Sequence, residues 1–337
     1  MGGLSGSFYL EGREVLTSAT VGVALSATAE DRPQDLLRNA DLALYEAKRR
    51  GKARYEVFDA KLGAEFSYRV ELEGALGRAL RRGEFVVYYQ PVVSVNTGEI
   101  VSMEALVRWE HPQRGVLGPE DFLTVAEETG LIGPIGEWVL REVCRQGRVW
   151  QERVWQERGA KRPAPRVGVN ISARQFLETD LLEKVAEALE ESGLETDNLS
   201  LEVAESTLMG DAETAVRKFR AIKDLGVGVA LDGFGSAYSS LSQLKRFPLD
   251  LVKLDRSLIV GLGEEPEGTA VVAAMIDLAH ALGCTVSAHG VETADQLAML
   301  RRLGCDLAQG YHFSKPVTSE EASALLEAGT QLISRSQ

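Results

Sequence analysis

The sequence predicts an α/β protein whose main part is a closed barrel of strands and helices. Beyond the first 60 or so residues, strand-like and helix-like segments alternate about every 20 to 35 residues, as in βα units on a mostly parallel sheet. Each strand candidate has one aliphatic face and one face of small or polar residues, with an ionisable or amide group near its end. Strands of this kind fit a barrel whose polar groups converge at one mouth.

A small α/β fragment is expected over residues 1–60. The segment "LTSATVGVAL" (16–25) has the pattern of a strand. In "DRPQDLLRNADLALYEAKRRGKARYEVF" (31–58) apolar residues recur at helical spacing, and the predicted helix ends near Gly51 before a short strand. The basic residues at the end of this helix are expected to be solvated and favourable to its dipole.

The predicted barrel, residues 61–337, begins with a helix and a hairpin. A long helix from Ala64 leads to "GEFVVYYQPVVSVNTGEIVSMEALVRWE" (83–110), in which Asn96-Thr97-Gly98 is a turn between two β-rich runs. Six further strands are predicted: "RVGVNIS" (166–172), "LSLEVAE" (199–205), "GVGVALD" (226–232), "DLVKLD" (250–255), "CTVSAHG" (284–290) and "DLAQGY" (306–311).

Strand parity brings a set of polar residues together. In "SLEVA", for example, Leu201 and Val203 share one face and Glu202 lies on the other. The polar residues near the strand ends are Glu104, Asn170, Glu202, Asp232, Lys253 and Gln309. Carboxylate and amide oxygens are the ligands of a hard divalent cation, so the pattern predicts a Mg²⁺ or Mn²⁺ site rather than a zinc site.

Composition restricts the partners and the compartment. The net charge of −13 argues against a nucleic-acid surface, so neither DNA nor RNA is expected as a partner. No segment has the length and apolarity of a membrane span, and no signal segment begins the sequence. The three cysteines lack a C-x-x-C spacing and fit reduced thiols, so we expect a cytoplasmic protein.

One repeat carries no chemistry. In "RVWQERVWQER", Arg148 to Glu152 recurs as Arg153 to Glu157. A shift of five residues turns a helix face by about 140°, so the two tryptophans cannot share a face. We interpret the repeat as a tandem duplication that lengthens a helix.

A series of motifs occurs in order along residues 65–330: "YYQP" from Tyr88, "EAL" from Glu104 followed by "VRW", "NISARQF" from Asn170, "LEVAES" from Leu201, "LKRFPLDLVKLDRS" from Leu244, "GVET" from Gly290 and "LGCDLAQGYHFSKP" from Leu303. With these motifs the sequence resembles the EAL family of cyclic di-GMP phosphodiesterases. Residues 1–60 resemble the last part of a GGDEF domain. They lack its nucleotide loop, so no diguanylate cyclase activity is expected.

The resemblance implies a modified TIM barrel, with its first strand antiparallel, that binds cyclic di-GMP at the mouth. It assigns Glu104, Asn170, Glu202 and Asp232 as metal ligands. It places Lys253 beside the attacking water, Gln309 where it helps to hold that water, and Glu205 where it anchors the loop after Asp232. The ligand contacts it implies are Gln90, Leu106 and Arg108, with Tyr311 as a possible stacking aromatic.

The chain departs from the family pattern at two positions. Gly233 stands where the family has a second aspartate that holds a second metal, and His289 replaces a catalytic-site glutamate. Glycine supplies no ligand, and a neutral imidazole adds none of the charge that offsets two divalent ions.

Three functions remain compatible with these residues. We favour a cyclic di-GMP receptor with little or no hydrolysis; the alternatives are a weakly active phosphodiesterase that forms linear pGpG and a scaffold that binds no nucleotide. A homodimer is also expected, with Phe234, Tyr238 and Leu241 as candidate apolar contacts.

Overall fold

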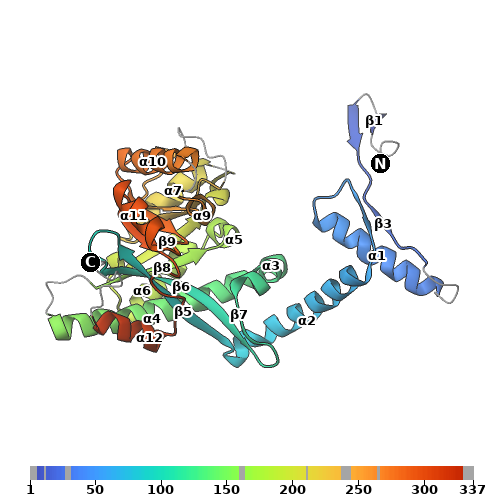
Figure 1. Cartoon of the computed structure of the whole chain (residues 1–337). Coiled ribbons are helices and arrows are strands. Elements are labelled where there is room, and N and C mark those ends of the chain that lie inside the picture. The colour runs from blue at the N-terminus through green and yellow to red at the C-terminus, as the bar shows by residue number, and fades with distance from the viewer. Residues whose placement is uncertain are drawn as a thin grey trace. The chain divides into compact units, whose positions relative to one another are not determined.

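The computed structural model describes residues 6–10, 13–26, 32–158, 164–209, 212–236, 244–263 and 266–328 (Figure 1). The chain divides into two compact units, Met1–Arg78 and Ala79–Gln337.

In the first unit one helix packs on a pair of parallel strands. β3 (Val21–Val23) pairs with β4 (Tyr55–Val57), and α1 (Pro33–Arg49) connects them. A side chain at Gly22 would not fit, because its Cβ would lie 2.0 Å from the carbonyl oxygen of Ala40 on α1. The strand expected over 16–25 is divided: β2 (Arg13–Thr17) pairs with β1 (Gly6–Leu10) in a separate antiparallel hairpin, and residues 18–20 belong to neither strand.

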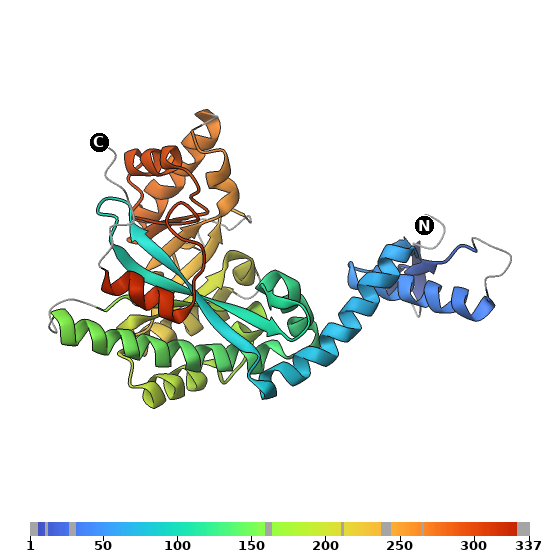
Figure 2. The ribbon, with the colours of Figure 1, turned by 60° about the horizontal axis from the view of Figure 1, so that its bottom comes forward.

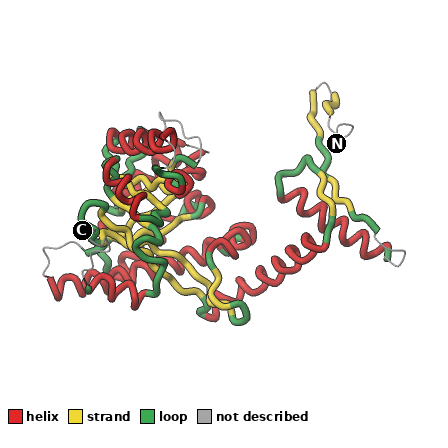
Figure 3. The backbone as a smooth tube through the Cα atoms, in the orientation of Figure 1, coloured by secondary structure: helices red, strands yellow, loops and turns green. Residues whose placement is uncertain are grey.

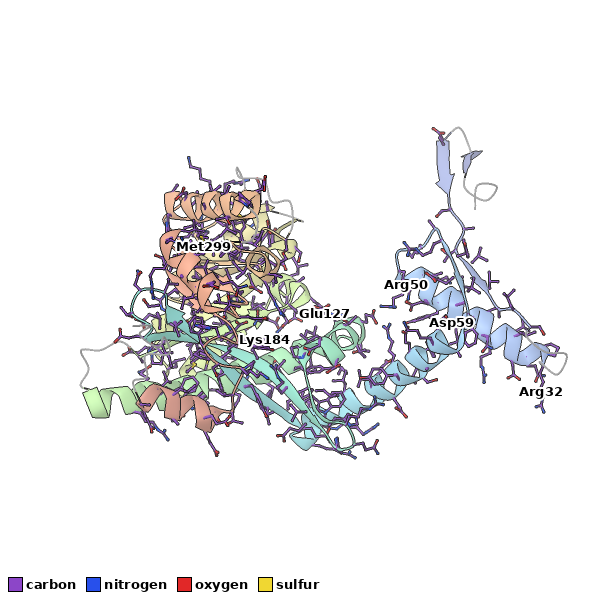
Figure 4. The ribbon with its side chains drawn as sticks, viewed as in Figure 1. Arg32, Arg50, Asp59, Glu127, Lys184 and Met299 are labelled. Atoms are coloured by element: carbon purple, nitrogen blue, oxygen red, sulfur yellow. The ribbon has the colours of Figure 1, made fainter. Side chains whose placement is uncertain are left out.

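The basic end of α1 is held by one carboxylate. Figure 4 shows Arg32 and Arg50 at opposite ends of this helix. Arg49 and Arg50 each approach a Glu46 oxygen to 2.6 Å, and they lower the pKa of that carboxyl. The cations therefore lie at the helix carboxyl terminus, where the dipole favours them.

Helix α2 (Ala60–Arg82) contains the position at which the two units divide. The predicted boundary at residue 60 coincides with the start of this helix, while the compact units separate at residue 78.

The second unit is the expected barrel. Its eight strands are β5 (Phe85–Ser94), β6 (Ile100–His111), β8 (Arg166–Ile171), β9 (Leu199–Ala204), β10 (Gly228–Phe234), β11 (Leu251–Leu254), β12 (Thr285–His289) and β13 (Leu307–Gln309). Neighbouring strands from β6 and β8 through to β13 run parallel, and β5 closes the barrel by pairing antiparallel with both β6 and β13. β7 (Gly115–Leu117) adds a short hairpin to β6.

Helices surround these strands (Figure 3). They are α3 (Pro119–Thr129), α4 (Ile132–Arg158), α5 (Ala173–Leu177), α6 (Leu181–Ser192), α7 (Ala212–Asp224), α9 (Arg256–Val260), α10 (Pro266–Ala281), α11 (Ala294–Arg302) and α12 (Ser319–Glu327), with 3₁₀ turns η1 (Thr196–Asn198) and η2 (Glu205–Met209). The aliphatic strand faces are buried, as parity predicts: Val167, Leu201, Val229 and Val286 are completely inaccessible. Burial of such aliphatic side chains is the main favourable term for the fold.

The tandem repeat lies within α4. Trp150, from its first copy, is buried, packs edge-on against Tyr89 with ring centroids 4.8 Å apart, and donates from Nε1 to Ser323 Oγ at 2.8 Å. Both views of the ribbon place α12, which carries Ser323, beside α4 (Figures 1 and 2). The side chain of Trp155, from the second copy, lies outside the described residues.

Within the described ranges, no helix is long and apolar enough to cross a membrane.

Candidate functional site

The predicted polar residues meet toward the carboxyl ends of the barrel strands, with Glu104 near the end of the part of β6 that pairs with β8. Glu104 (β6), Asn170 (β8) and Glu202 (β9) follow one another around the barrel, with Asn170 and Glu202 in register. Asp232, Lys253, His289 and Gln309 come from β10, β11, β12 and β13. Parallel strands end at one rim, so a single feature of the topology brings residues from the whole barrel together.

Glu104 is the centre of this cluster. It is buried, with one oxygen accepting from Asn170 Nδ2 at 2.7 Å and the other from Gln309 Nε2 at 2.7 Å. Burial alone would raise the pKa of Glu104, but the Lys253 charge and these two hydrogen bonds lower it to about 2. Glu104 is therefore ionised at neutral pH.

Lys253 is the buried cation of the site. Only 1% of its surface is exposed, and its Nζ lies 3.0 Å from Glu104 Oε2, 3.9 Å from Asp232 Oδ1 and in hydrogen-bond contact with Glu202. Burial opposes its charge, but the carboxylates outweigh burial and raise its pKa above the ordinary value. Burial also raises the pKa of Glu202, and Glu104 and Asp232 add to that rise.

His289 has an unsatisfied nitrogen. Its Nε2 lies 3.8 Å from Glu104 Oε2, and it has no hydrogen-bond partner among the residues that the structure describes. Burial and the Lys253 charge lower the pKa of His289 to about 4, so the ring is neutral at pH 7. On the neighbouring strand, the Oε1 atom of Gln309 also has no hydrogen-bond partner among the described residues.

The loop after Asp232 begins with a left-handed residue. Gly233 has φ of +70°, and a Cβ built on it would lie 3.5 Å from Ser236 Oγ and 3.9 Å from Asp255 Oδ2, so a small side chain has room there. Glu205 accepts a hydrogen bond from the Gly235 amide at 3.0 Å, the contact expected of a loop anchor. Of the candidate dimer contacts, Phe234 is buried and so presents no docking surface, while Tyr238 and Leu241 lie outside the described residues.

A cleft of about 240 Å³ opens beside the cluster. It is lined by Gln90, Glu104, Leu106, Arg256, His289, Gly290, Glu292, Gln309, Gly310 and Tyr311. Gln90 also connects the two ends of the barrel chain: its Oε1 accepts from Gln309 Nε2 at 3.0 Å, and its Nε2 donates to the Ser314 carbonyl at 3.0 Å.

Three of the four expected ligand contacts line this cleft: Gln90, Leu106 and Tyr311. Arg108 does not, because its guanidinium donates to the Val107 carbonyl at 2.8 Å and lies over the Tyr88 ring. The sequence reasoning did not single out Arg256 and Glu292, which do line the cleft. Both fall inside quoted motifs, "LDRS" and "GVET", and their charges beside an expected anion site were a usable signal.

The donor set fits one hard cation in its chemistry. Glu104, Glu202 and Asp232 offer carboxylate oxygens, and Asn170 uses Nδ2 toward Glu104, which leaves its Oδ1 for a ligand role. In the described part of the chain, no three His, Cys, Asp or Glu side chains are already arranged around a common ion position. Lys253 lies among these carboxylates and offsets part of their negative charge.

Comparisons with known proteins agree with this architecture. Residues 73–316 match the EAL domain family, and residues 3–54 match the diguanylate cyclase GGDEF domain. The chain is 39% identical over 321 residues to the bifunctional diguanylate cyclase/cyclic di-GMP phosphodiesterase MucR of Pseudomonas aeruginosa, covering 95% of this chain and 46% of MucR. It is 38% identical over 304 residues to the cyclic di-GMP phosphodiesterase PdeR of Escherichia coli K12, covering 90% of this chain and 45% of PdeR.

A solved structure described as the PaMucR phosphodiesterase in complex with c-di-GMP matches with a TM-score of 0.71 and 41% identity. The match covers 75% of this chain and 99% of that one. The chain thus spans less than half the length of MucR and PdeR, but nearly all of the solved PaMucR phosphodiesterase chain.

The closed barrel and the acidic, oxygen-rich cluster at its rim define a TIM-barrel-like protein with its site at the carboxyl ends of the strands. The family match covers most of the sequence. The chain belongs to the EAL domain family, and a short GGDEF-like segment precedes that domain.

Proposed function

We propose that this protein is a receptor for cyclic di-GMP with little or no hydrolytic activity. The observation that carries the proposal is the pair of altered positions at an otherwise complete site. Gly233 has no side chain, and the neutral ring of His289 lies 3.8 Å from the central carboxylate Glu104. Both positions would need carboxylates to hold a second cation, and two-metal hydrolysis depends on both ions.

The ligand is proposed to lie in the cleft, against Gln90, Leu106 and Tyr311. Arg108 remains a proposed contact that would have to leave Tyr88 to reach the cleft. The unsatisfied atoms of His289 and Gln309 support occupancy of the cleft by a polar ligand, since buried polar groups normally have hydrogen-bond partners.

One Mg²⁺ or Mn²⁺ is proposed to be held by Glu104, Asn170, Glu202 and Asp232. When bound, such an ion acts as a Lewis acid toward a phosphate oxygen. Lys253 and Gln309 are proposed to hold a water molecule beside the phosphate, and Glu205 to hold the loop after Asp232. All of these proposed roles fall to residues that match the family pattern, and none depends on the altered positions Gly233 and His289.

A weak phosphodiesterase is the second candidate. The intact residues Glu104, Glu202 and Lys253 favour it, as does the phosphodiesterase activity of the relatives MucR and PdeR. In this case His289 would take the part of the missing carboxylate. The product would be linear pGpG.

The setting of the receptor is also part of the proposal. We infer a homodimer, the commonest closed symmetric assembly, formed in the cytoplasm. The buried free thiols Cys144, Cys284 and Cys305 support a reducing compartment. Light scattering at tens of micromolar tests the dimer, and a monomeric mass would contradict it.

The experiment that separates the candidates measures binding and turnover together. The protein is incubated with cyclic di-GMP and Mg²⁺ or Mn²⁺, linear product is followed by chromatography, and binding is measured by calorimetry. Binding without product supports the receptor. Rapid formation of pGpG supports the enzyme, and no binding at all supports the scaffold.

A further inference from the structure

Arg256 is the only cation among the residues that line the cleft within the described chain. It follows Asp255, the N-cap of α9, and so lies just beyond the end of β11. The other ionisable groups in the lining are the carboxyls of Glu104 and Glu292 and the neutral ring of His289. An anionic ligand that enters the cleft therefore has one positive side chain to meet.

A glycine leaves room for the aliphatic part of the Arg256 side chain. Gly290 has φ of +78°, and a Cβ on it would lie 2.4 Å from Arg256 Cγ and 3.0 Å from Arg256 Cδ. The aliphatic part of Arg256 thus lies across the backbone at the end of β12 in the space that a side chain would occupy. This packing keeps the guanidinium at the rim of the cleft.

Glu292 orients the guanidinium without covering it. Arg256 Nη2 donates to Glu292 Oε1 at 2.6 Å, while the two side chains are 63% and 46% exposed. A guanidinium has five N–H donors in a planar fork, so this bond leaves donors for a second acceptor. An exposed ion pair of this kind contributes little to stability, so its loss should not unfold the protein.

We propose that Arg256 is the cationic contact for a phosphate group of an anionic dinucleotide bound in this cleft. The chain carries a net charge of −13, so such a ligand needs a local cation to offset the acidic surroundings. Lys253 contacts buried carboxylates and does not line the cleft, and Arg108 reaches the cleft only if it leaves Val107 and Tyr88. Arg256 remains as an accessible fork that matches phosphate geometry. The inference rests on the proposed function, because it takes cyclic di-GMP as the ligand.

The test measures cyclic di-GMP affinity by calorimetry in the full chain at several salt concentrations. Arg256→Gln removes the charge and should weaken binding by about 10- to 100-fold, the usual effect of a lost charge-assisted hydrogen bond. Its affinity should also depend less on salt than that of the starting protein. Arg256→Lys keeps the charge but not the fork and should lie between the two. Arg302→Gln, an exposed arginine on α11 outside the lining, is the matched control and should bind normally.

Several results would overturn the inference. If the starting protein binds cyclic di-GMP and Arg256→Gln binds equally well, Arg256 is not the contact while the receptor proposal survives. A loss of affinity that is the same at every salt concentration would assign Arg256 a structural role. If the starting protein does not bind at all, the receptor proposal and this inference both fail. Thermal unfolding of each variant checks that the fold is intact.

Discussion

Lys253 Nζ lies 3.0 Å from Glu104 Oε2, and both side chains are almost completely buried. The ammonium also contacts Glu202 and approaches Asp232, so a single positive charge faces three carboxyl groups. Without a bound ion, the stability of the barrel rim depends on this lysine.

Replacing that lysine should therefore destabilise the metal-free protein strongly. Lys253→Met leaves Glu104 and Glu202 without a cation, and breaking a buried pair in this way costs about 3–5 kcal/mol. Denaturant unfolding in EDTA measures the loss. Added Mn²⁺ should restore more stability to this variant than to the starting protein, because the ion would then supply the missing charge.

Lys223→Met is the matched control for that variant. Lys223 pairs with Asp250 at 2.6 Å, but both side chains are about one-third exposed. The expected loss is about 1 kcal/mol or less. Equal losses in the two variants would contradict the role given to Lys253.

Restoring both carboxylates should restore hydrolysis. Gly233→Asp alone should give a small gain, because His289 still leaves a second ion short of an anionic oxygen. Gly233→Asp with His289→Glu should raise the rate of pGpG formation by orders of magnitude, at about tenfold per 1.4 kcal/mol, and the two effects should be strongly non-additive. The left-handed φ of +70° at Gly233 is one that Asp tolerates better than most residues.

The isosteric control is Gly233→Asn with His289→Gln. It has nearly the same shape but adds no charge, so it should leave the rate of hydrolysis unchanged. The double variant with both carboxylates could bind cyclic di-GMP and Mg²⁺ normally yet hydrolyse no faster than the starting protein. That result would contradict the account of the two positions and would point to the geometry of the loop after Asp232.

His289 should make the metal-free protein less stable in mild acid. The pKa of His289 is lowered to about 4 in the folded protein, below the ordinary value of 6.5. The unfolded chain therefore binds a proton first as the pH falls, and stability is lost below about pH 6.5. Between pH 7.5 and pH 5 the loss from this group is about 2 kcal/mol. Denaturant unfolding in EDTA measures it, and His289→Gln should remove this part of the pH dependence; an unchanged profile would contradict the assignment.

Deleting one copy of the tandem repeat should be tolerated. Removal of residues 153–157 leaves the same residue types at positions 148 to 153, because Arg158 then follows Glu152. Trp150 keeps its bond to Ser323, and an arginine still faces Glu327, which Arg153 now contacts at 2.6 Å. The expected cost is about 1 kcal/mol or less, against about 3–5 kcal/mol for Trp150→Ala. Thermal unfolding compares the two, and a deletion as damaging as Trp150→Ala would give the second copy a structural role.

Much of the barrel could be predicted from the sequence because strand parity is a strict rule. Glu202 alternates with Leu201 and Val203, and that alternation places the carboxylate inside and the aliphatic residues against the helices. The hairpin at Asn96-Thr97-Gly98 could also be predicted, because its turn lies between two long β-rich runs. The convergence of Glu104, Asn170 and Gln309 followed from topology alone.

Other features depend on contacts that no local pattern encodes. Nothing in the sequence around Lys253 says that its Nζ contacts Glu104 rather than solvent, because that depends on the register of non-adjacent strands. The position of the Arg108 guanidinium over the Tyr88 ring likewise depends on tertiary contacts. The strand predicted over 16–25 was wrong in one respect: residues 18–20 separate β2, which pairs with β1, from β3, which pairs with β4.

The hydrogen bond between Gln90 and Gln309 joins residues 219 positions apart, and it forms between the strand that opens the barrel chain and the strand that completes it. During synthesis, Gln90 leaves the ribosome long before its partner. A nascent or truncated chain that ends before β13 has two open sheet edges, and Glu104 in it lacks one of its hydrogen-bond donors. Ligand binding should therefore appear only when β13 has docked, so that binding would report that synthesis has passed Gln309.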